Sequence, residues 1–347
     1  MTPEIQIGGR SVGPDHPCYI IAEIGVNHNG DLDLAHKLID LAAQTGADAV
    51  KFQTYVTDEL VLPDAQQADY QARNLGRKSQ AEMLRDYELP FSAFVELQAH
   101  CARVGIDFIS TAFDAVSLEF VIGLRPVCLK WASGELTNMP LLRMASKAGL
   151  PMLLSTGMGT VTEISRARDW LGPAVDTVIL QCVSQYPAAI ADQNLRVIPA
   201  MQNVFGCPVG FSDHTVGPYA AVAARALGMA VLEKHFTLDS AMPGPDHAAS
   251  VMPDEFTHMV QVLREIEVGL GDGVKQPRLS ERNTSGVARK SLVFRRDLPK
   301  GHVLTEADLT AKRPGSGLPP ERFDEFMGRV LRRDVHRDDL VEKSDAQ

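Results

Sequence analysis

The chain has 347 residues, of which 45% are hydrophobic, and it carries a formal net charge of −10 at pH 7. This length leaves room for a module beyond one large domain, and the acidic balance argues against nucleic acid or an anionic membrane surface as the main partner. The five cysteines are odd in number and show no CxxC spacing, which is typical of buried free thiols in a reducing compartment. Residues 1–10 lack the apolar core of a signal peptide, and no apolar run approaches the length of a membrane span. We therefore expect a cytoplasmic protein without a membrane segment.

Eight short apolar runs, each ending in polar residues, dominate the first three quarters of the chain. Residues 1–17 precede them, and Gly8-Gly9 predicts the turn of a hairpin that closes the floor of the fold. The runs are Tyr19–Glu23, Ala49–Gln53, Asp107–Thr111, Val127–Lys130, Pro151–Ser155, Val178–Cys182, Pro208–Ser212 and Val231–His235. The segments between them have helical spacing, and strand alternating with helix eight times predicts an α/β fold of the (β/α)8 TIM-barrel type.

The connections divide the chain into predicted domains. Residues 56–90 are unusually long for a connection and polar, without a strong core pattern, so we expect them to border the substrate mouth. The barrel is predicted to end at residue 271, followed by a linker over 272–288. Turns and short strands, expected around Ser291–Arg295 and Val330–Arg333, predict a small β-rich domain over 289–347.

Polar residues at the carboxyl ends of the predicted strands mark the candidate site, because barrel enzymes place their chemistry there. In chain order these residues are Glu23, Lys51, Gln53, Thr111, Lys130, Ser133, Glu135, Ser155, Ser184, Tyr186, Ser212, His214 and His235. So many polar groups at one barrel mouth predict an enzyme with a buried anionic substrate. The sequence contains neither GxGxxG nor GxxxxGK[ST], so nucleotide binding has no support.

His214 and His235 follow neighbouring strands, which lie about 4.8 Å apart in a sheet. Two imidazoles at matched depth can share a metal ion that polarises a carbonyl group. The alternative is two histidines that are hydrogen-bonded separately in a polar barrel mouth, and both interpretations stay open on the residues alone.

Lys51 and Lys130 emerge from the second and fourth strands. Each could neutralise a phosphate or a carboxylate, or form a Schiff base if its pKa is depressed. The surrounding hydroxyls belong to Thr111, Ser133, Ser155, Ser184 and Ser212. One such serine would more simply cap a helix, but the set predicts a cradle for phosphate and carboxylate groups.

Carboxylates complete the candidate site. Glu23 and Glu135 could transfer protons or hold sugar hydroxyls, although Glu23 could equally form a salt bridge with Lys51. Asp246 lies in the Pro/Gly-rich loop after the last strand, where it could bind a sugar hydroxyl or serve only as a turn residue.

Motifs along nearly the whole chain resemble the sialic acid synthase family. They are Ile21-Ala-Glu-Ile-Gly-Val-Asn-His-Asn-Gly, Lys51-Phe-Gln, Ser133-Gly-Glu, Leu154-Ser-Thr-Gly-Met, Phe211-Ser-Asp-His-Thr, Glu233-Lys-His-Phe-Thr and Gly244-Pro-Asp-His. The C-terminal segment resembles the antifreeze-like SAF domain of that family, a β-clip fold. The resemblance implies a transferase that condenses phosphoenolpyruvate with N-acetylmannosamine to give N-acetylneuraminate, with loss of phosphate by C–O cleavage.

The resemblance also implies roles for individual residues. His214 and His235 would ligate Mn²⁺ or Mg²⁺, and Glu135 would handle protons or the attacking water beside the reacting carbons. Phosphoenolpyruvate would be held by Lys51, Thr111, Lys130, Ser133, Ser155, Ser184 and Ser212, and the open-chain sugar by Glu23, Gln53, Asn74, Tyr186 and Asp246. In a domain-swapped homodimer, Arg313 would reach the partner's site and contact the N-acetyl group.

Three departures from the family pattern concern substrate choice. Ser184 stands where Asn is common, Ala112 where Pro often follows Ser-Thr, and Ala248 where Lys often follows Asp-His. Alternatives for the acceptor are a 2,4-diacetamido-2,4,6-trideoxyhexose, which would give a legionaminate-type product, and N-acetylmannosamine 6-phosphate. Alternatives of other classes are a Schiff-base aldolase that uses Lys130 and a non-catalytic carbohydrate-binding protein.

Overall fold

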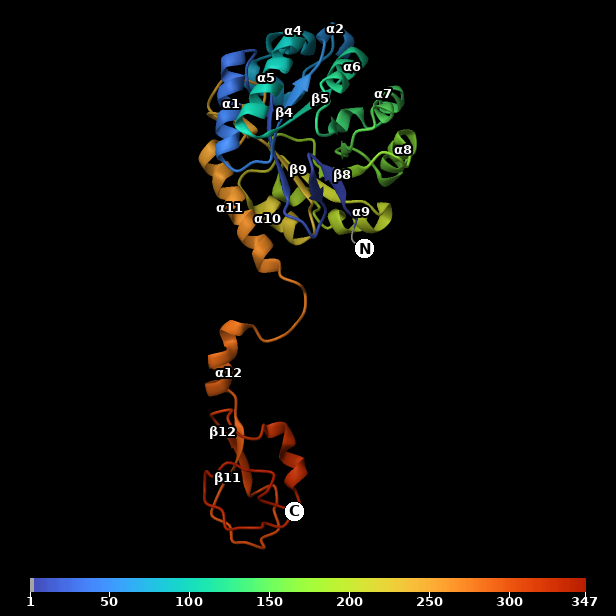
Figure 1. Ribbon diagram of the computed structural model, residues 1–347. Helices are drawn as coiled ribbons and strands as arrows, with labels where there is room; N and C mark the ends of the chain where they lie inside the picture. Colours follow the sequence, from blue (N-terminus) through green and yellow to red (C-terminus); the bar gives the residue numbers. More distant parts are fainter. Residues whose placement is uncertain (1–2) are drawn as a thin grey trace. The chain divides into compact units, whose positions relative to one another are not determined.

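The computed structural model describes residues 3–347 and divides into two compact units, one ending at Gly271 and the other spanning Asp272–Gln347 (Figure 1). Each unit has a hydrophobic core of its own. None of the helices within residues 3–347 combines the length and the apolar character needed to cross a membrane.

The first unit is a closed barrel of eight parallel strands in which β10 pairs with β3. The strands are β3 (Tyr19–Gly25), β4 (Ala49–Thr54), β5 (Asp107–Ala112), β6 (Leu129–Trp131), β7 (Met152–Ser155), β8 (Thr177–Cys182), β9 (Val209–Asp213) and β10 (Val231–His235). They follow one another around the barrel in chain order. The (β/α)8 prediction is therefore confirmed, with all eight predicted runs forming strands.

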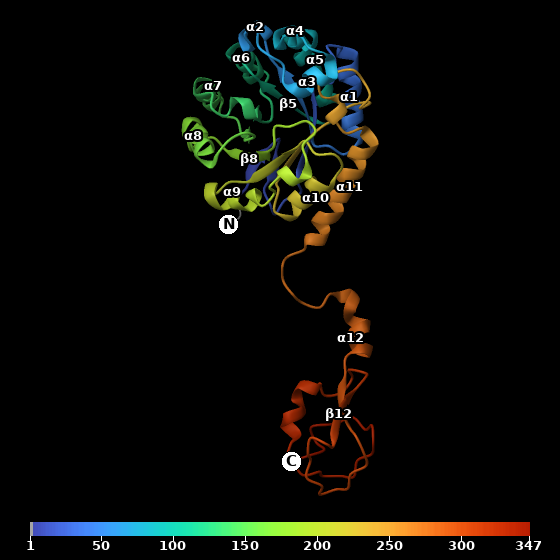
Figure 2. The same cartoon turned by 180° about the vertical axis from the view of Figure 1, so that it is seen from behind.

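Helices surround the barrel on its outer side (Figures 1 and 2). They are α1 (Leu32–Gln44), α2 (Thr57–Leu60), α3 (Asp69–Leu75), α4 (Gln80–Tyr87), α5 (Phe91–Val104), α6 (Ala115–Gly123), α7 (Met139–Ala145), α8 (Val161–Leu171), α9 (Val197–Phe205), α10 (Tyr219–Ala226) and α11 (Pro253–Leu270). Side-chain caps start several of them: Asp31 accepts from the amides of Asp33 and Leu34 at the start of α1. The buried positions of α1 are Ala35, Leu38, Ile39 and Ala42, the spacing of one apolar helix face.

The strand period of two explains where the site forms. On β3, Tyr19 and Ile21 pack in a core cluster inside the barrel, and Glu23 is the next residue on the same face. On β4 the same face carries Ala49, then Lys51. The inward-facing residues of each strand are thus apolar near the barrel floor and polar at the carboxyl end. The packed apolar residues at the floor therefore hold the polar side chains at the mouth in place.

The N-terminal hairpin closes the barrel floor, as predicted. Strand β1 (Ile5–Ile7) pairs antiparallel with β2 (Arg10–Val12), and Gly8 and Gly9 between them both have positive φ. Ile5, Ile7 and Val12 belong to the same buried cluster as the inward residues of the strands. The hairpin therefore fills the barrel interior from below and leaves the carboxyl end as the open end.

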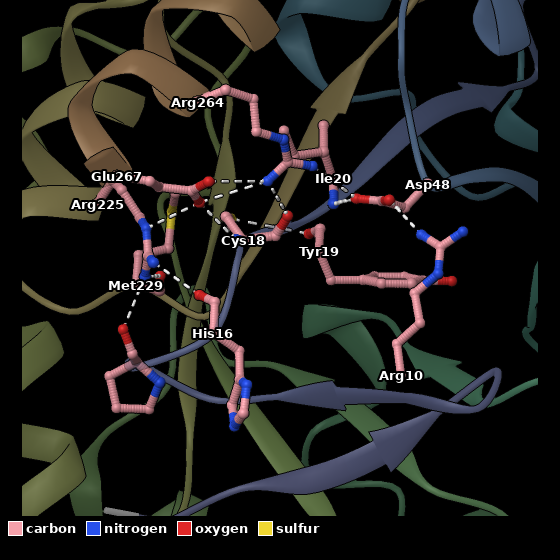
Figure 3. A network of polar contacts seen from close by, with 11 residues as sticks. Arg10, His16, Cys18, Tyr19, Ile20, Asp48, Arg225, Met229, Arg264 and Glu267 are labelled. Atoms are coloured by element: carbon pink, nitrogen blue, oxygen red, sulfur yellow. Dashed lines mark hydrogen bonds and ion pairs between the residues drawn. The ribbon is translucent and has the colours of Figure 1, made fainter. Parts of the chain in front are cut away.

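A network of charged side chains fixes the start of β3 at this floor (Figure 3). Asp48 accepts from the amide of Ile20 at 2.8 Å and pairs with Arg264 of α11 at 3.1 Å. Glu267 of α11 accepts from the amide of Cys18 and pairs with Arg225 of α10 at 3.1 Å. These bonds tie α10 and α11 to the strand that closes the barrel.

The connection over residues 56–90 is more ordered than its sequence indicated. Besides α2, α3 and α4, it has a small core in which Met83 and Tyr87 pack with Tyr55 and Val26. The expectation of no strong core pattern is therefore wrong. The pattern was missed because the apolar residues of α4 recur at helical spacing over only two turns. The expectation that this connection borders the mouth is confirmed, since Tyr70, Gln71 and Met83 line the cavity described below.

The second unit is small and built largely from turns. It contains α12 (Arg282–Ala288), which lies within the predicted linker, and β11 (Ser291–Phe294), paired antiparallel with β12 (Leu309–Lys312). The strand predicted at Val330–Arg333 is wrong: Val330 and Leu331 each form only an isolated bridge. Strand β12 was not predicted. Short 3₁₀ turns complete both units at Ser133–Glu135, Ser146–Ala148, Ile190–Asp192, His247–Ala249, Leu279–Glu281 and Pro320–Phe326.

Candidate active site

A cavity of about 400 Å³ opens at the carboxyl end of the barrel. The predicted site residues that line it are Glu23, Lys51, Gln53, Thr111, Lys130, Ser133, Ser155, Ser184, Tyr186, Ser212, His214, His235 and Asp246. They come from every strand of the barrel or from the loop that follows it. The structure thus brings most of the predicted residues to one place.

Lys51 lies at the centre of the polar cluster and is almost fully buried. Its Nζ is 2.8 Å from Oε2 of Glu23 and donates to Oγ1 of Thr111 at 3.1 Å. Gln53 donates to the other oxygen of Glu23 at 3.1 Å. The predicted Glu23–Lys51 salt bridge is therefore present, and both groups still face the cavity.

Lys130 is held by a residue that the sequence reasoning did not single out. Oε1 of Glu233 lies 3.3 Å from Nζ of Lys130, and Oε2 lies 3.8 Å from Nζ of Lys51. Ser212 donates to Oε1 of Glu233 at 2.9 Å. Glu233 is thus a shared counter-charge between two buried ammonium groups. The period of two on β10 could have identified it, since Glu233 precedes His235 on the same face.

The carboxyl groups of the cavity differ in their ionisation. Burial opposes the charged form of Glu233, but Lys130 and Lys51 outweigh it and lower its pKa to about 2. Burial, together with the charge of Glu23, raises the pKa of Asp246 to about 6. Burial also raises the pKa of Glu23, against the opposing effect of Lys51. The two lysines therefore face one firmly ionised carboxylate and two that take up protons more readily.

His214 and His235 lie side by side, with ring centroids 5.4 Å apart. Nδ1 of His214 is 2.8 Å from the carbonyl oxygen of Val183, an arrangement that puts the lone pair on Nε2, which lies 3.4 Å from Oγ of Ser212. Nδ1 of His235 is buried and has no hydrogen-bond partner in the protein. Burial, the largest cause, holds the pKa of His235 well below its usual value, so its ring is neutral.

This pair fits a metal ion that shares its other positions with water or substrate. The orphaned ring nitrogen and the carbonyl-oriented partner are the features expected of two imidazole ligands. Residues 3–347 hold no group of three or more His, Cys, Asp and Glu side chains placed to bind a metal.

Hydroxyl groups surround the lysines on the far side of the cavity. Ser133 accepts from the amide of Gly157 at 2.9 Å, and Oγ of Ser155 is buried without a protein partner. A Cβ at Gly157 would collide with Oγ of Ser184 and lie 2.9 Å from that of Ser133, so only glycine fits. The cavity wall at this point carries the hydroxyls of Ser133, Ser155 and Ser184, which can donate to an anion, whereas the amide of Gly157 is already bonded to Ser133.

The rim of the cavity is aromatic and amide-rich. Tyr186 lies against His214 with ring centroids 4.1 Å apart, and Tyr70 of α3 lies 5.0 Å from Tyr186. Asn74 does not line the cavity; its amide donates to the carbonyl of Pro245 at 2.8 Å and so holds the loop that carries Asp246. Tyr70 was not predicted, because no motif or spacing marks it.

Besides Asn74, two predicted residues lie outside the main cavity. The carboxyl group of Glu135 lines an adjoining cavity and accepts from Nδ2 of Asn138 at 2.6 Å. Arg313 belongs to the second unit, where its Nε donates to the carbonyl of Ala288 and the side chain is exposed. The roles predicted for these two residues stay predictions.

An eight-stranded barrel with buried cations, carboxylates and imidazoles at its carboxyl end defines a TIM-barrel enzyme. Residues 38–275 match the NeuB family and residues 289–347 match the SAF domain. The chain belongs to the NeuB family, which confirms the resemblance to sialic acid synthases with a C-terminal SAF domain.

Individual relatives agree with this assignment. The chain is 42% identical to N,N'-diacetyllegionaminic acid synthase of Legionella pneumophila, over 93% of both chains. It is 37% identical to human N-acetylneuraminate-9-phosphate synthase, over 96% of this chain and 94% of the relative. The crystal structure of N-acetylneuraminic acid synthetase from Leptospira borgpetersenii matches with a TM-score of 0.72 and 32% identity, covering 82% of this chain and 95% of that one. The chain is an enzyme of the transferase type.

Proposed function

We propose that the enzyme condenses phosphoenolpyruvate and water with the open-chain aldehyde of an N-acylated amino sugar, giving a nine-carbon 2-keto acid and phosphate. N-acetylmannosamine, which would give N-acetylneuraminate, is the acceptor that the family resemblance implies. The observation that carries this proposal is the pair of buried lysines in one cavity that hydroxyl donors and two imidazoles also line. A substrate with a phosphate and a carboxylate uses both cations, and a sugar aldehyde fits the imidazole side. The names of the relatives point to the same reaction class.

In this proposal, the lysines and hydroxyls bind and orient phosphoenolpyruvate. Lys51 and Lys130 neutralise its charges, while the hydroxyls of Ser133 and Ser155 donate to its oxygens. The apolar floor of the barrel keeps bulk water from below, so C3 is presented toward the cavity mouth. Glu23 and Asp246 accept hydrogen bonds from sugar hydroxyls, and this fixes the aldehyde above C3.

A divalent ion, Mn²⁺ or Mg²⁺, bound by His214 and His235 would polarise the aldehyde as a Lewis acid. The neutral ring of His235 and its unpartnered Nδ1 support this assignment. We further propose that the enzyme acts as a homodimer in which Arg313 contacts the N-acyl group in the partner's site.

A second acceptor has support of its own. The chain is more similar to the diacetyllegionaminic acid synthase than to the human 9-phosphate synthase, at 42% against 37% identity. A 2,4-diacetamido-2,4,6-trideoxyhexose is therefore the second candidate. N-acetylmannosamine 6-phosphate is disfavoured, because Lys51 and Lys130 are the only Lys or Arg side chains that line the described cavity.

Phosphate release from phosphoenolpyruvate with Mn²⁺ tests the reaction. We expect release only when an amino sugar is present and loss of release after EDTA treatment. Absence of release with N-acetylmannosamine, its 6-phosphate and the diacetamido sugar would refute the proposal. Trapping of the enzyme by borohydride would instead favour a Schiff-base aldolase.

A further inference from the structure

A second cavity adjoins the mouth of the barrel, and no role has been assigned to the space that it encloses. Its volume is about 300 Å³, and it lies between α2, α4 and the turn after β6. It is lined by Gln53, Tyr55, Leu60, Val61, Gln71, Gln80, Leu84, Phe113 and Glu135. The two spaces share a wall, because five residues line both: Gln53, Gln71, Gln80, Leu84 and Phe113. We refer to this space as the side cavity.

The lining of the side cavity is about half polar and half apolar, with amide groups and one acid among its polar part. Leu60, Val61 and Leu84 present aliphatic surface, and Tyr55 and Phe113 present aromatic surface. Neither Lys nor Arg lines it among the described residues. A phosphate or carboxylate substituent would therefore meet a negative charge and no cation, which excludes anionic groups.

The polar groups match a secondary amide. Glu135 is half-buried, and its Oε2 accepts from Asn138, which leaves Oε1 able to accept another hydrogen bond. The side chains of Gln71 and Gln80 carry amide donors. An acylamino group would donate its N–H to Glu135, accept at its carbonyl from a glutamine, and place its methyl group against the aliphatic wall.

We propose that the side cavity is the subsite for a second acylamino group of the acceptor sugar. The proposal rests on the proposed function and selects the diacetamido sugar over N-acetylmannosamine. The diacetamido sugar carries its second acylamino group at C4, where N-acetylmannosamine has a hydroxyl. The wall formed by residues 56–90 becomes the element that determines acceptor choice.

The test fills the side cavity without touching the main one. Val61 lines only the side cavity, so V61F occupies its space, whereas the neighbouring Leu62 is 74% exposed and L62F serves as the matched control. The acceptors are N-acetylmannosamine, its 6-deoxy analogue and the 2,4-diacetamido-2,4,6-trideoxy sugar, which separates the effect of the 6-deoxy position from that of the second acylamino group. Phosphate release gives kcat and KM for each.

For the wild-type enzyme we expect a kcat/KM at least tenfold higher with the diacetamido sugar than with the other two acceptors. V61F should lower that value at least tenfold, mainly through KM, and change the values for the other two sugars less than twofold. L62F should change none. Equal loss on all acceptors, no loss on any, or a wild-type preference for N-acetylmannosamine would overturn the side-cavity proposal while leaving the synthase function in place. No phosphate release with any sugar would refute the proposed function itself.

V61A is a second variant in case V61F proves less stable by thermal denaturation. It enlarges the side cavity, so the ratio of activity with a 4-propanamido homologue to that with the 4-acetamido sugar should rise at least threefold. An unchanged ratio would contradict the assignment, because the acyl chain would then lie elsewhere.

Discussion

Replacing Glu233 by Gln tests the electrostatic arrangement of the cavity directly. The carboxylate lies 3.3 Å from Lys130 and 3.8 Å from Lys51. At an effective dielectric constant of about 20, these separations correspond to attractions of about 5 and about 4 kcal/mol before desolvation is counted. Lys51 keeps Glu23 at 2.8 Å in the variant, whereas Lys130 keeps only the neutral carbonyl of Trp131 at 3.3 Å. The loss therefore falls mainly on Lys130.

Breaking a buried ion pair costs about 3–5 kcal/mol, and we expect E233Q to lose about 3 kcal/mol of unfolding free energy at pH 7. Burial already lowers the pKa of Lys130, and removing Glu233 lowers it further. The unfolded state then binds more protons than the folded state at alkaline pH, so the stability of the variant should rise with pH toward the usual lysine pKa. Urea unfolding across this pH range measures both effects.

Inorganic phosphate should restore the unfolding free energy that E233Q loses, because it supplies the missing negative charge to the lysines. A phosphate about 6 Å from the carboxylate position is repelled by about 3 kcal/mol at an effective dielectric constant of about 20. E233Q should therefore bind phosphate at least tenfold more tightly than the wild type in calorimetry. E119Q, which makes the same charge change at an exposed position, is the control. If E233Q has the same unfolding free energy and the same phosphate affinity as the wild type, the assignment of Glu233 as a shared counter-charge is wrong.

Four further predictions concern other parts of the molecule. H235A should lose Mn²⁺ binding in calorimetry, since one imidazole then remains; retained affinity would place the metal elsewhere. K234M should lower the unfolding free energy of the barrel by about 3–5 kcal/mol, because Asp213 lies 2.7 Å from Lys234 in a fully buried pair; a D213N/K234M double variant that is no more stable than K234M would contradict this. D308N should destabilise the second unit by about 2 kcal/mol. Although burial opposes ionisation, hydrogen bonds from His302, Arg296 and Thr305 lower the pKa of Asp308. The stability that this carboxylate contributes is therefore full above the usual aspartate pKa and is lost as the pH falls below it. R313A should mainly impair sugar use, and mixing it with K51A should restore part of the activity; without restoration, the proposed exchange of Arg313 between partners is wrong.

The barrel could be predicted from the sequence because every strand is a continuous apolar run followed by a polar end. Period two within a strand also determines which residues enter the lumen, and Glu233 was missed only because the reasoning stopped at the last residue, His235. Strand β12 could not be predicted from the sequence, for a different reason. Its four residues, Leu309–Lys312, include a single buried one, which is too short a pattern to separate from a turn.

The position of Glu135 shows what sequence spacing does not convey. Ser133 and Glu135 are two residues apart in one motif and would share a face if the strand continued. Strand β6 ends at Trp131, however, and residues Ser133–Glu135 form a 3₁₀ turn. The turn separates the two side chains, so Ser133 lines the main cavity and Glu135 lines the side cavity.

The main cavity has no surplus of fixed positive charge, although its proposed substrate is an anion. Lys51 and Lys130 face Glu23, Glu233 and Asp246, so the fully ionised set is net negative. An incoming anion therefore needs compensation, and the cavity has two means of providing it. Burial raises the pKa of Asp246 to about 6 and raises that of Glu23, so each takes up a proton more readily when another anion enters. The neutral imidazole of His235 leaves room for a divalent cation, which supplies the rest. Anion binding, proton uptake and metal binding should then be mutually reinforcing, because each relieves the cost of the others.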